Sequence, residues 1–240
     1  MPKLLDFKGV KAGSPLKILN KSETEAEIVV YAGIGQDFWG DGSMISAKNF
    51  SDELKKLPDS VKNINVRINS PGGDVFDGIA IYNRLKQHKA KKTVYVDGLA
   101  ASIASIIALA GDEIIMGEGA LFMVHLPWTW AAGNRNDLDN IINRLTDVEE
   151  QMISIYTKKT KMSRTEVRAM LEAETWMDSE EAIDKGFVDK KSEETFAIAA
   201  SVKKSPWINK MPEKFVSEAD VIQEKVNALK KNLSACLARK

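Results

Sequence analysis

The sequence predicts an α/β fold built from a repeated strand-turn-helix unit. From residue 26 to about residue 190, short segments rich in β-branched residues alternate with segments whose apolar residues recur at helical spacing. Glycine-bearing turns separate the two kinds of segment. Strands that alternate with helices favour parallel pairing, with the sheet and the helices in separate layers. With 240 residues, 44% of them hydrophobic, the chain can bury a sizeable core.

The expected elements follow one another in chain order. Strands are expected at residues 16–19, 27–31, 65–69, 93–97, 113–116 and 121–125. Helices are expected at 47–57, 74–88, 102–110 and 136–159, and the turns at 70–73 and 98–101 each lead into a helix. Two later helices open with capping boxes, Ser163 with Glu166 and Asp178 with Glu181, and Gly186 is placed to end the second.

Composition divides the chain into three parts. Residues 1–25 are polar and mixed and are interpreted as an N-terminal arm, and residues 26–199 as the main domain. From residue 200 a Lys/Ser/Pro stretch leads into a charged amphipathic helix that begins near Ser217. We interpret residues 200–240 as a linker and an appended helix.

Charge and cysteine content argue against several classes of protein. Lys and Arg total 34, as do Asp and Glu, so net charge points to neither nucleic acid nor an anionic membrane. The single cysteine provides neither a disulfide framework nor a cysteine-rich metal site. The first residues lack a signal-peptide run, and no segment approaches the roughly 18 apolar residues of a membrane span. We expect a soluble cytoplasmic protein.

Ser102 lies where small residues turn after a strand and an apolar helix begins. A serine there faces free backbone N–H groups and the positive end of the helix, which stabilise a developing negative charge. The structural alternative is an ordinary helix N-cap, since serine is a preferred cap. Ser105 is a rival one turn into the helix, where its hydroxyl can instead bond back to a backbone carbonyl.

The turn Ser70-Pro71-Gly72-Gly73 follows a second expected strand. Adjacent glycines let the backbone approach a ligand closely. On a functional interpretation, the N–H groups of Gly73 and Ile103 form an oxyanion hole. On a structural interpretation, the segment is a tight strand-to-helix turn without further purpose.

Two histidines limit the choice of a general base. His88 closes a charged helix and is expected to be solvated. His125 ends an apolar strand and emerges into a loop, a placement that suits a cleft. The alternative for His125 is a core histidine whose hydrogen bonds are satisfied.

An acid to orient His125 is sought on either side of Trp176. Asp178 has a structural role as a helix N-cap, which leaves Glu174 as the better candidate and Asp178 as the alternative. A solvated carboxylate at a helix end is an equally good interpretation of Glu174.

Four segments in order resemble signatures of the ClpP peptidase family: INSPGGDVFDGIAIYNRLK, DGLAASIASIIALAGDE, FMVHLP and TWMDSEEAIDKGFVD. The resemblance covers residues 26–190 and implies a ClpP/crotonase-like layered fold with a long handle-like helix. It implies Ser102 as nucleophile, His125 as base, and Gly73 and Ile103 as oxyanion donors. The third triad residue of the family is usually an Asp two residues before an aromatic, and here Glu174 holds that position.

The resemblance also implies an activity. It points to an ATP-independent serine endopeptidase that cleaves protein or peptide substrates through an acyl-enzyme, without metal or cofactor. The 136–159 helix, with its near-heptad apolar stripe, is expected to hold homo-oligomeric rings together in part. The alternative is that the stripe packs into the core of its own subunit.

The aromatic loop after His125 and the appended segment resemble the ClpP-related head maturation proteases of phages and prophages. Those enzymes process scaffold or capsid proteins, which implies a place in the bacterial host cytoplasm or the procapsid. The first alternative is a housekeeping ClpP-like subunit that works with an ATPase unfoldase. The others are a crotonase-like acyl-CoA enzyme and a catalytically inactive assembly protein.

Overall fold

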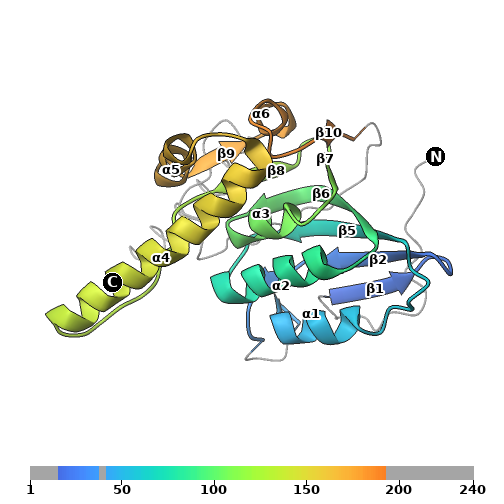
Figure 1. The fold of residues 1–240 in the computed structure, drawn as a ribbon, viewed down its shortest axis with the longest axis horizontal. Coiled ribbons are helices and arrows are strands. Elements are labelled where there is room, and N and C mark those ends of the chain that lie inside the picture. Colours follow the sequence, from blue (N-terminus) through green and yellow to red (C-terminus); the bar gives the residue numbers. More distant parts are fainter. Residues whose placement is uncertain (1–15, 38–41, 193–240) are drawn as a thin grey trace, which may run out of the picture. The chain divides into compact units, whose positions relative to one another are not determined.

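The structure, a computed structural model, describes residues 16–37 and 42–192, all within one compact unit. Helices are layered against a largely parallel sheet (Figure 1), so the expected layered α/β fold is confirmed. The appended helix expected from residue 217 and the first 15 residues of the expected N-terminal arm lie outside the described residues.

The main sheet of the described region has eight strands. They are β1 (Leu16–Asn20), β2 (Glu25–Val30), β5 (Asn63–Ser70), β6 (Lys91–Ala101), β7 (Glu113–Met116), β8 (Leu121–Val124), β9 (Thr175–Met177) and β10 (Lys190–Lys191). Two short strands, β3 (Gly33–Ile34) and β4 (Met44–Ile45), form a second sheet. The helices are α1 (Ala47–Leu54), α2 (Val75–Gln87), α3 (Ile103–Ala108), α4 (Arg135–Thr160), α5 (Arg164–Glu172) and α6 (Ser179–Asp184).

Strand β6 organises the sheet because it changes partner along its length. Its first part pairs in parallel with β5 and β7, and its last three residues, 99–101, pair in parallel with β8. Strand β8 pairs in turn with β9, and this pairing is antiparallel. The sheet therefore divides at β6, and the chain leaves β6 at Ser102, beside the start of β8.

The core lies between the sheet and the helices that Figure 1 shows in front of it, α1, α2 and α3. Alternate residues of β5, Ile64, Val66 and Ile68, are fully buried in this core. Arg67 points to the opposite face, where its Nε donates to Asp97 at 2.7 Å and the Tyr31 hydroxyl donates to the same carboxylate. The buried charges on that face are therefore paired.

Most expected elements are confirmed, with shifted ends. The capping boxes of α5 and α6 form as expected, and Gly186 follows the C-cap of α6 with φ 79°. One expectation is wrong, because the turn at residues 98–101 is the end of β6. The helix expected at 47–57 is confirmed, but it ends at Leu54. Small residues at 98–101 look like a turn in isolation, but pairing with β8 keeps them extended.

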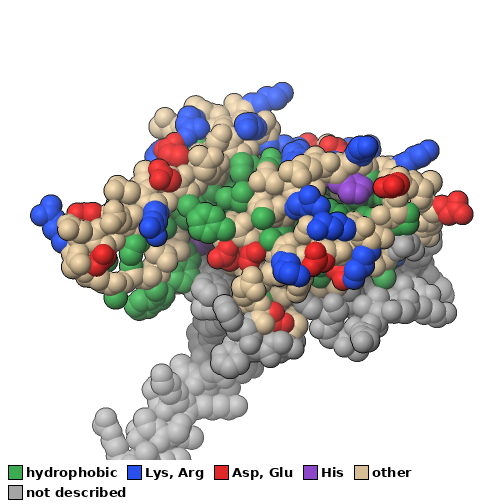
Figure 2. Space-filling view, turned by 60° about the horizontal axis from the view of Figure 1, so that its bottom comes forward, with side chains coloured by type: hydrophobic (Ala, Val, Ile, Leu, Met, Phe, Trp, Pro, Cys, Tyr) green, Lys and Arg blue, Asp and Glu red, His purple; other side chains and the backbone are tan. Residues whose placement is uncertain are grey.

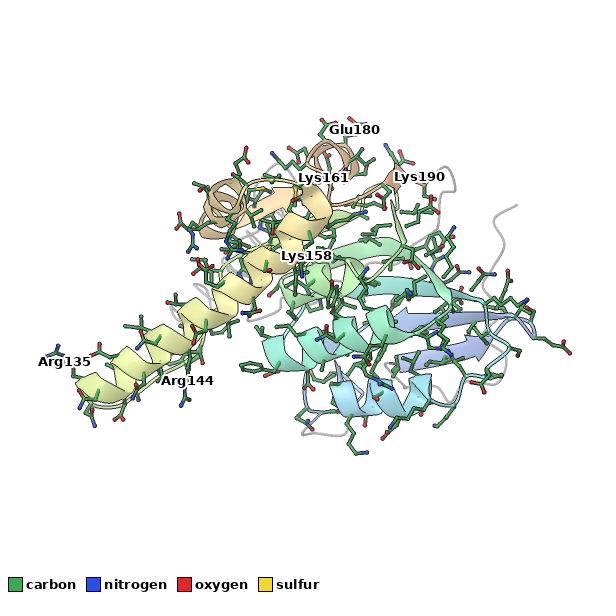
Figure 3. The ribbon with its side chains drawn as sticks, in the orientation of Figure 1. Arg135, Arg144, Lys158, Lys161, Glu180 and Lys190 are labelled. Atoms are coloured by element: carbon green, nitrogen blue, oxygen red, sulfur yellow. The ribbon has the colours of Figure 1, made fainter. Side chains whose placement is uncertain are left out.

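The two halves of helix α4 differ in burial, and the first half projects from the domain (Figure 1). Figure 3 labels Arg135 and Arg144 on the projecting part and Lys158 near the other end. The expected apolar stripe divides accordingly, because Met152 and Tyr156 are buried whereas Ile142 is 59% exposed. Figure 2 shows hydrophobic side chains along the lower edge of this projecting part, at the left.

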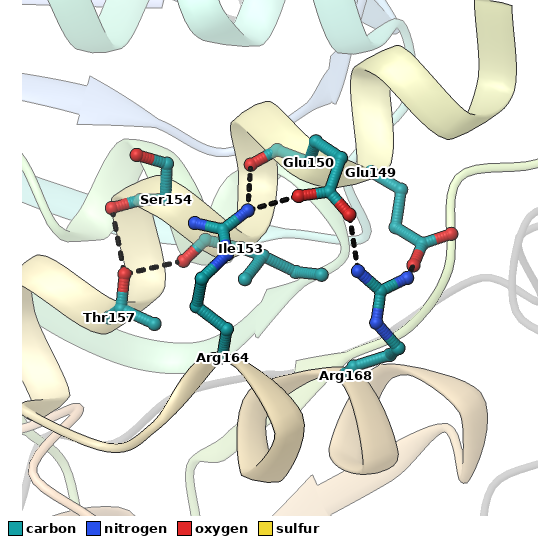
Figure 4. A network of polar contacts seen from close by, with 7 residues as sticks. All are labelled: Glu149, Glu150, Ile153, Ser154, Thr157, Arg164 and Arg168. Atoms are coloured by element: carbon teal, nitrogen blue, oxygen red, sulfur yellow. Dashed lines mark hydrogen bonds and ion pairs between the residues drawn. The ribbon is translucent and has the colours of Figure 1, made fainter. Parts of the chain in front are cut away.

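A network of ion pairs joins the second half of α4 to α5 (Figure 4). Arg168 pairs with Glu149 and Glu150, and Arg164 pairs with Glu150. Each such pair near the surface contributes little to stability by itself, although a network can contribute more. The network holds α5 on α4, and α5 leads directly into the segment that carries Glu174.

Candidate active site

Ser102 lies between the end of β6 and α3 in a backbone conformation that non-glycine residues rarely adopt. Its φ is 54° and its ψ is −129°, and its side chain makes no capping hydrogen bond to α3. Its N–H donates to the carbonyl of Met123 on β8 at 2.9 Å. Non-glycine residues in such conformations cost about 1–3 kcal/mol and gather at functional sites. The ordinary N-cap interpretation of Ser102 is therefore wrong.

His125 follows β8 and faces this serine. Its Nε2 lies 2.8 Å from Ser102 Oγ, and both residues are buried, with 4% and 8% of their surface exposed. Burial lowers the pKa of His125 below its ordinary value, and the nearby negative charge of Glu174 opposes that shift. A largely neutral imidazole in contact with a serine hydroxyl can accept its proton.

The glycine turn packs directly against Ser102. A Cβ on Gly72, which has φ 87°, would lie 2.6 Å from the carbonyl oxygen of Ala101 and 2.8 Å from the Ser102 Cβ. Only glycine allows this approach. Gly73 forms a parallel bridge with Ile34 that uses the N–H of Ile34 and the N–H of Asp74. This bridge leaves the Gly73 N–H pointing away from Ile34.

Ile103 is the first residue of α3, so its N–H has no acceptor within the helix. It lies next to the glycine turn, since a Cβ on Gly72 would stand 3.1 Å from its nitrogen. The structure thus brings the Ser70–Gly73 turn, Ser102 and Ile103 together, as the functional interpretation requires.

The pairing of β8 with β9 brings Glu174 to His125. The register sets Met123 opposite Trp176 and Val124 opposite Thr175. His125 and Glu174 directly adjoin the last pair of this register, and the effect of the Glu174 charge on the pKa of His125 shows that the two side chains lie near each other. Glu174 has φ 48° and is partly buried, so it is not a freely solvated carboxylate at a helix end.

Asp178 is not placed to orient His125. The same register carries it past the end of β9, to a level opposite Leu121, four residues before His125 or about 13 Å along a strand. Its carboxylate accepts the N–H of Glu181 at 2.9 Å and caps α6. Of the two carboxylates considered from the sequence, the structure brings Glu174 to the histidine.

The remaining candidates from the sequence have structural roles. His88 is partly buried rather than solvated, and its Nδ1 accepts the N–H of Ala90 at 3.1 Å at the end of α2. Ser105 is fully buried, and its hydroxyl donates to the carbonyl of Ser102, the back-bond expected from its place in the helix.

Sequence reasoning missed strand β9, and with it the reason why Glu174 lies near His125. Its three residues, Thr-Trp-Met, alternate too briefly to be recognised without their partner strand. In residues 16–37 and 42–192, no three or more His, Cys, Asp or Glu side chains gather into a metal-binding group. No helix of that same region is long and apolar enough to cross a membrane.

A buried serine and histidine in hydrogen-bond contact, beside unengaged backbone N–H groups, define a site of the serine hydrolase type. Comparisons with known proteins agree. A family model described as Clp protease matches residues 44–194. The chain is 30% identical over 154 residues to the ATP-dependent Clp protease proteolytic subunit 1 of Chlamydia pneumoniae, which covers 60% of this chain and 81% of that protein.

A second relative is the ATP-dependent Clp protease proteolytic subunit of Leuconostoc citreum, 33% identical over 135 residues, or 55% of this chain and 68% of that protein. Among solved structures, a mutant of ClpP1 from Listeria monocytogenes superposes with a TM-score of 0.60. The superposition covers 70% of this chain and 91% of the Listeria chain, at 23% sequence identity. At this level of identity the likeness supports the fold alone. The chain belongs to the Clp protease family, and it is a serine-type peptidase by that membership.

Proposed function

We propose that this protein is a serine endopeptidase whose catalytic triad is Ser102, His125 and Glu174. The observation that carries the proposal is the 2.8 Å contact between Ser102 Oγ and His125 Nε2, made by a serine whose backbone is strained and whose hydroxyl caps no helix. Glu174 supports the histidine from the neighbouring strand and stabilises the imidazolium that forms during the reaction.

The reaction follows from these positions. His125 Nε2 takes the proton of the Ser102 hydroxyl as Oγ attacks the carbonyl carbon of the scissile peptide bond. The tetrahedral intermediate collapses as the imidazolium gives that proton to the leaving amine, and an acyl-enzyme remains. Water, deprotonated by the same imidazole, then attacks the ester, and the released Oγ recovers its proton.

The N–H groups of Gly73 and Ile103 stabilise the oxyanion in this mechanism. Both belong to segments that contact Ser102, and neither is used in the parallel bridge or within α3. Loss of one such donor typically costs about 2.7–4 kcal/mol of transition-state stabilisation. No step requires a metal, a cofactor or ATP.

A fluorophosphonate probe tests this proposal. We expect the probe to label Ser102 of the native protein, as located by peptide mass spectrometry, and to leave Ser102→Ala unlabelled. Ser163→Ala is the matched control, because it removes another helix-starting serine and should be labelled like the native protein. Absence of label on native Ser102 would favour a crotonase-like acyl-CoA enzyme or an inactive assembly protein.

The natural role we propose is phage or prophage head maturation, by cleavage of scaffold or capsid protein in the host cytoplasm or the procapsid. Two features support it. The loop after His125 presents Trp128 and Trp130, 41% and 91% exposed, and residues 200–240 form an extra segment beyond the family match. The names of the Chlamydia and Leuconostoc relatives favour the alternative, a housekeeping subunit that depends on an ATPase.

Incubation with candidate scaffold and capsid proteins, followed by sequencing of new termini, separates these two roles. Specific cleavage without ATP supports head maturation. Cleavage of folded protein only in the presence of an unfoldase and ATP supports the housekeeping role. Ser102→Ala is the control for contaminating proteases in both arms.

Assembly into homo-oligomeric rings is part of the proposal, with the projecting half of α4 as a contact. Leu138 and Ile142 are 40% and 59% exposed there, and clustered exposed apolar side chains mark interaction surfaces. Sedimentation should show an oligomer that Ile142→Lys weakens and the matched neighbour Asn143→Lys does not. A native monomer at micromolar concentration would contradict this.

A further inference from the structure

A buried polar pair lies directly behind the strained serine. The hydroxyl of Ser105, on α3, donates to the carbonyl oxygen of Ser102, and its oxygen lies 2.7 Å from the hydroxyl of Tyr156, on α4. Both side chains are fully buried. The Tyr156 ring packs edge-on against Phe187, with 5.7 Å between ring centroids, so the hydroxyl is held in place.

Stability alone does not account for this pair. The helix that carries Ser105 is otherwise apolar and buried, since Ile103, Ala104, Ile106 and Ile107 are all fully buried. Replacing both partners of a buried hydrogen bond by apolar groups of the same shape is nearly neutral for stability. Alanine and phenylalanine would fit here without any polar group to satisfy, so another property of the pair needs an explanation.

The group that the pair holds is the peptide between Ser102 and Ile103. The Ser102 carbonyl accepts both the Ser105 hydroxyl and the Ser105 N–H, the latter at 3.0 Å. A trans peptide is planar, with its C=O and N–H pointing in opposite directions. Fixing the direction of the Ser102 carbonyl therefore fixes the direction of the Ile103 N–H, which emerges on the opposite side.

The hydrogen bonds to the Ser102 carbonyl also polarise the Ser102–Ile103 peptide, which strengthens the Ile103 N–H that they orient. A hydrogen bond to a peptide carbonyl strengthens the N–H of that peptide as a donor, and the effect grows where water is excluded. Tyr156, as the far member of the chain, orients the Ser105 hydroxyl and anchors it to the buried half of α4. The strained φ of Ser102 makes such support necessary, because this conformation persists only where the surroundings over-determine it.

We propose that Ser105 and Tyr156 are positioning residues that hold the Ser102–Ile103 peptide, and so aim the Ile103 N–H at the oxyanion of the transition state. The inference rests on the proposed peptidase function and extends it by two residues that touch no substrate. Because the oxyanion forms only during the reaction, the pair should act on kcat and leave KM nearly unchanged.

The test compares Ser105→Ala, Tyr156→Phe and the double variant, with kcat and KM for a short peptide and the free energy of unfolding measured for each. We expect kcat to fall about 10- to 100-fold in Ser105→Ala and less in Tyr156→Phe, as for small misplacements of catalytic groups. The double variant should regain native stability, since no hydroxyl is left unpaired, yet keep the low kcat of Ser105→Ala.

Whether kcat and the free energy of unfolding change independently shows whether the pair positions the peptide or is merely structural. If the double variant regains kcat together with stability, or if the single variants change KM alone, the pair is merely structural and the inference is wrong. Should Ser105→Ala fail to fold, Tyr156→Phe and the double variant still give the comparison. Fluorophosphonate labelling of native Ser102 is measured first: its absence refutes the proposed function itself, whereas labelled native protein with undiminished variants refutes only the positioning role.

Discussion

Ser163 and Ser102 each precede a helix, and their hydroxyl groups do different things. Ser163, before α5, has an extended backbone (φ −66°, ψ 155°), and its hydroxyl accepts the N–H of Glu166. Ser102, before α3, has φ 54° and ψ −129°, caps nothing, and contacts His125. A capping hydroxyl stabilises a protein by about 1 kcal/mol, whereas a strained backbone such as that of Ser102 costs about 1–3 kcal/mol.

The comparison shows that the backbone, rather than the residue type, decides what a helix-starting serine does. Ser163 stands in a turn between two helices, where local geometry lets its side chain fold back on α5. Ser102 is held from outside, by β8 through its N–H and by the close approach of Gly72. Its hydroxyl is turned away from the helix and is available to a residue 23 positions later in the chain.

The largest effect should come from Ser102→Ala. We expect kcat for a peptide substrate to fall by about six orders of magnitude, because loss of the nucleophile removes the joint contribution of the triad. The free energy of unfolding should be unchanged or higher, since no cap is lost. Comparable hydrolysis by this variant would remove the contrast between the two serines, and Ser105 would become the next candidate.

The next largest effect on kcat should come from Glu174, and it can be compared with that of Asp178. Glu174→Ala should lower kcat by up to about 10⁴-fold, less than His125→Ala, because an orienting acid contributes less than the base. Asp178→Ala should leave kcat nearly intact and destabilise the fold by about 1 kcal/mol through loss of the α6 cap. If Asp178→Ala is the more damaging to kcat at unchanged stability, Glu174 is the wrong acid.

The pH profile of the activity tests the influence of Glu174 on His125, with a smaller expected effect. His125 must be neutral to accept the proton, and burial lowers its pKa, so activity should persist below the ordinary histidine pKa of 6.5. Glu174→Gln removes the charge that raises this pKa, so the acid limb of kcat/KM should move to still lower pH. An acid limb that moves to higher pH in Glu174→Gln contradicts the assigned role of Glu174.

Ser163→Ala should have the smallest effect and completes the comparison. Loss of its cap should lower the free energy of unfolding by about 1 kcal/mol, measured by urea denaturation, with kcat unchanged. Ser163→Asp is the matched control, because Asp is an equally good cap and should restore stability. A large loss of kcat in Ser163→Ala would mean that α5 couples to the site more strongly than its cap indicates.

Much of this architecture is predictable from local pattern. Strands rich in β-branched residues, apolar residues at helical spacing and the capping boxes at Ser163 and Asp178 are short-range signals, and each reappears in the structure with its ends shifted by a few residues. The pairing of Ser102 with His125 was also within reach, because only two histidines exist and only one ends an apolar strand.

Other features depend on contacts between distant segments. The sequence by itself determined the order of the helices and of the longer strands, the helix starts and the short set of reactive side chains, because these follow from neighbours a few residues apart. It did not reveal the short strands β3, β4, β9 and β10. Only the tertiary structure decided that residues 98–101 extend a strand, that Glu174 rather than Asp178 lies near His125, and that Tyr156 stands behind Ser105. In each case the deciding partner lies 20 to more than 50 residues away, and strand register and helix packing, which no local pattern encodes, bring the partners together.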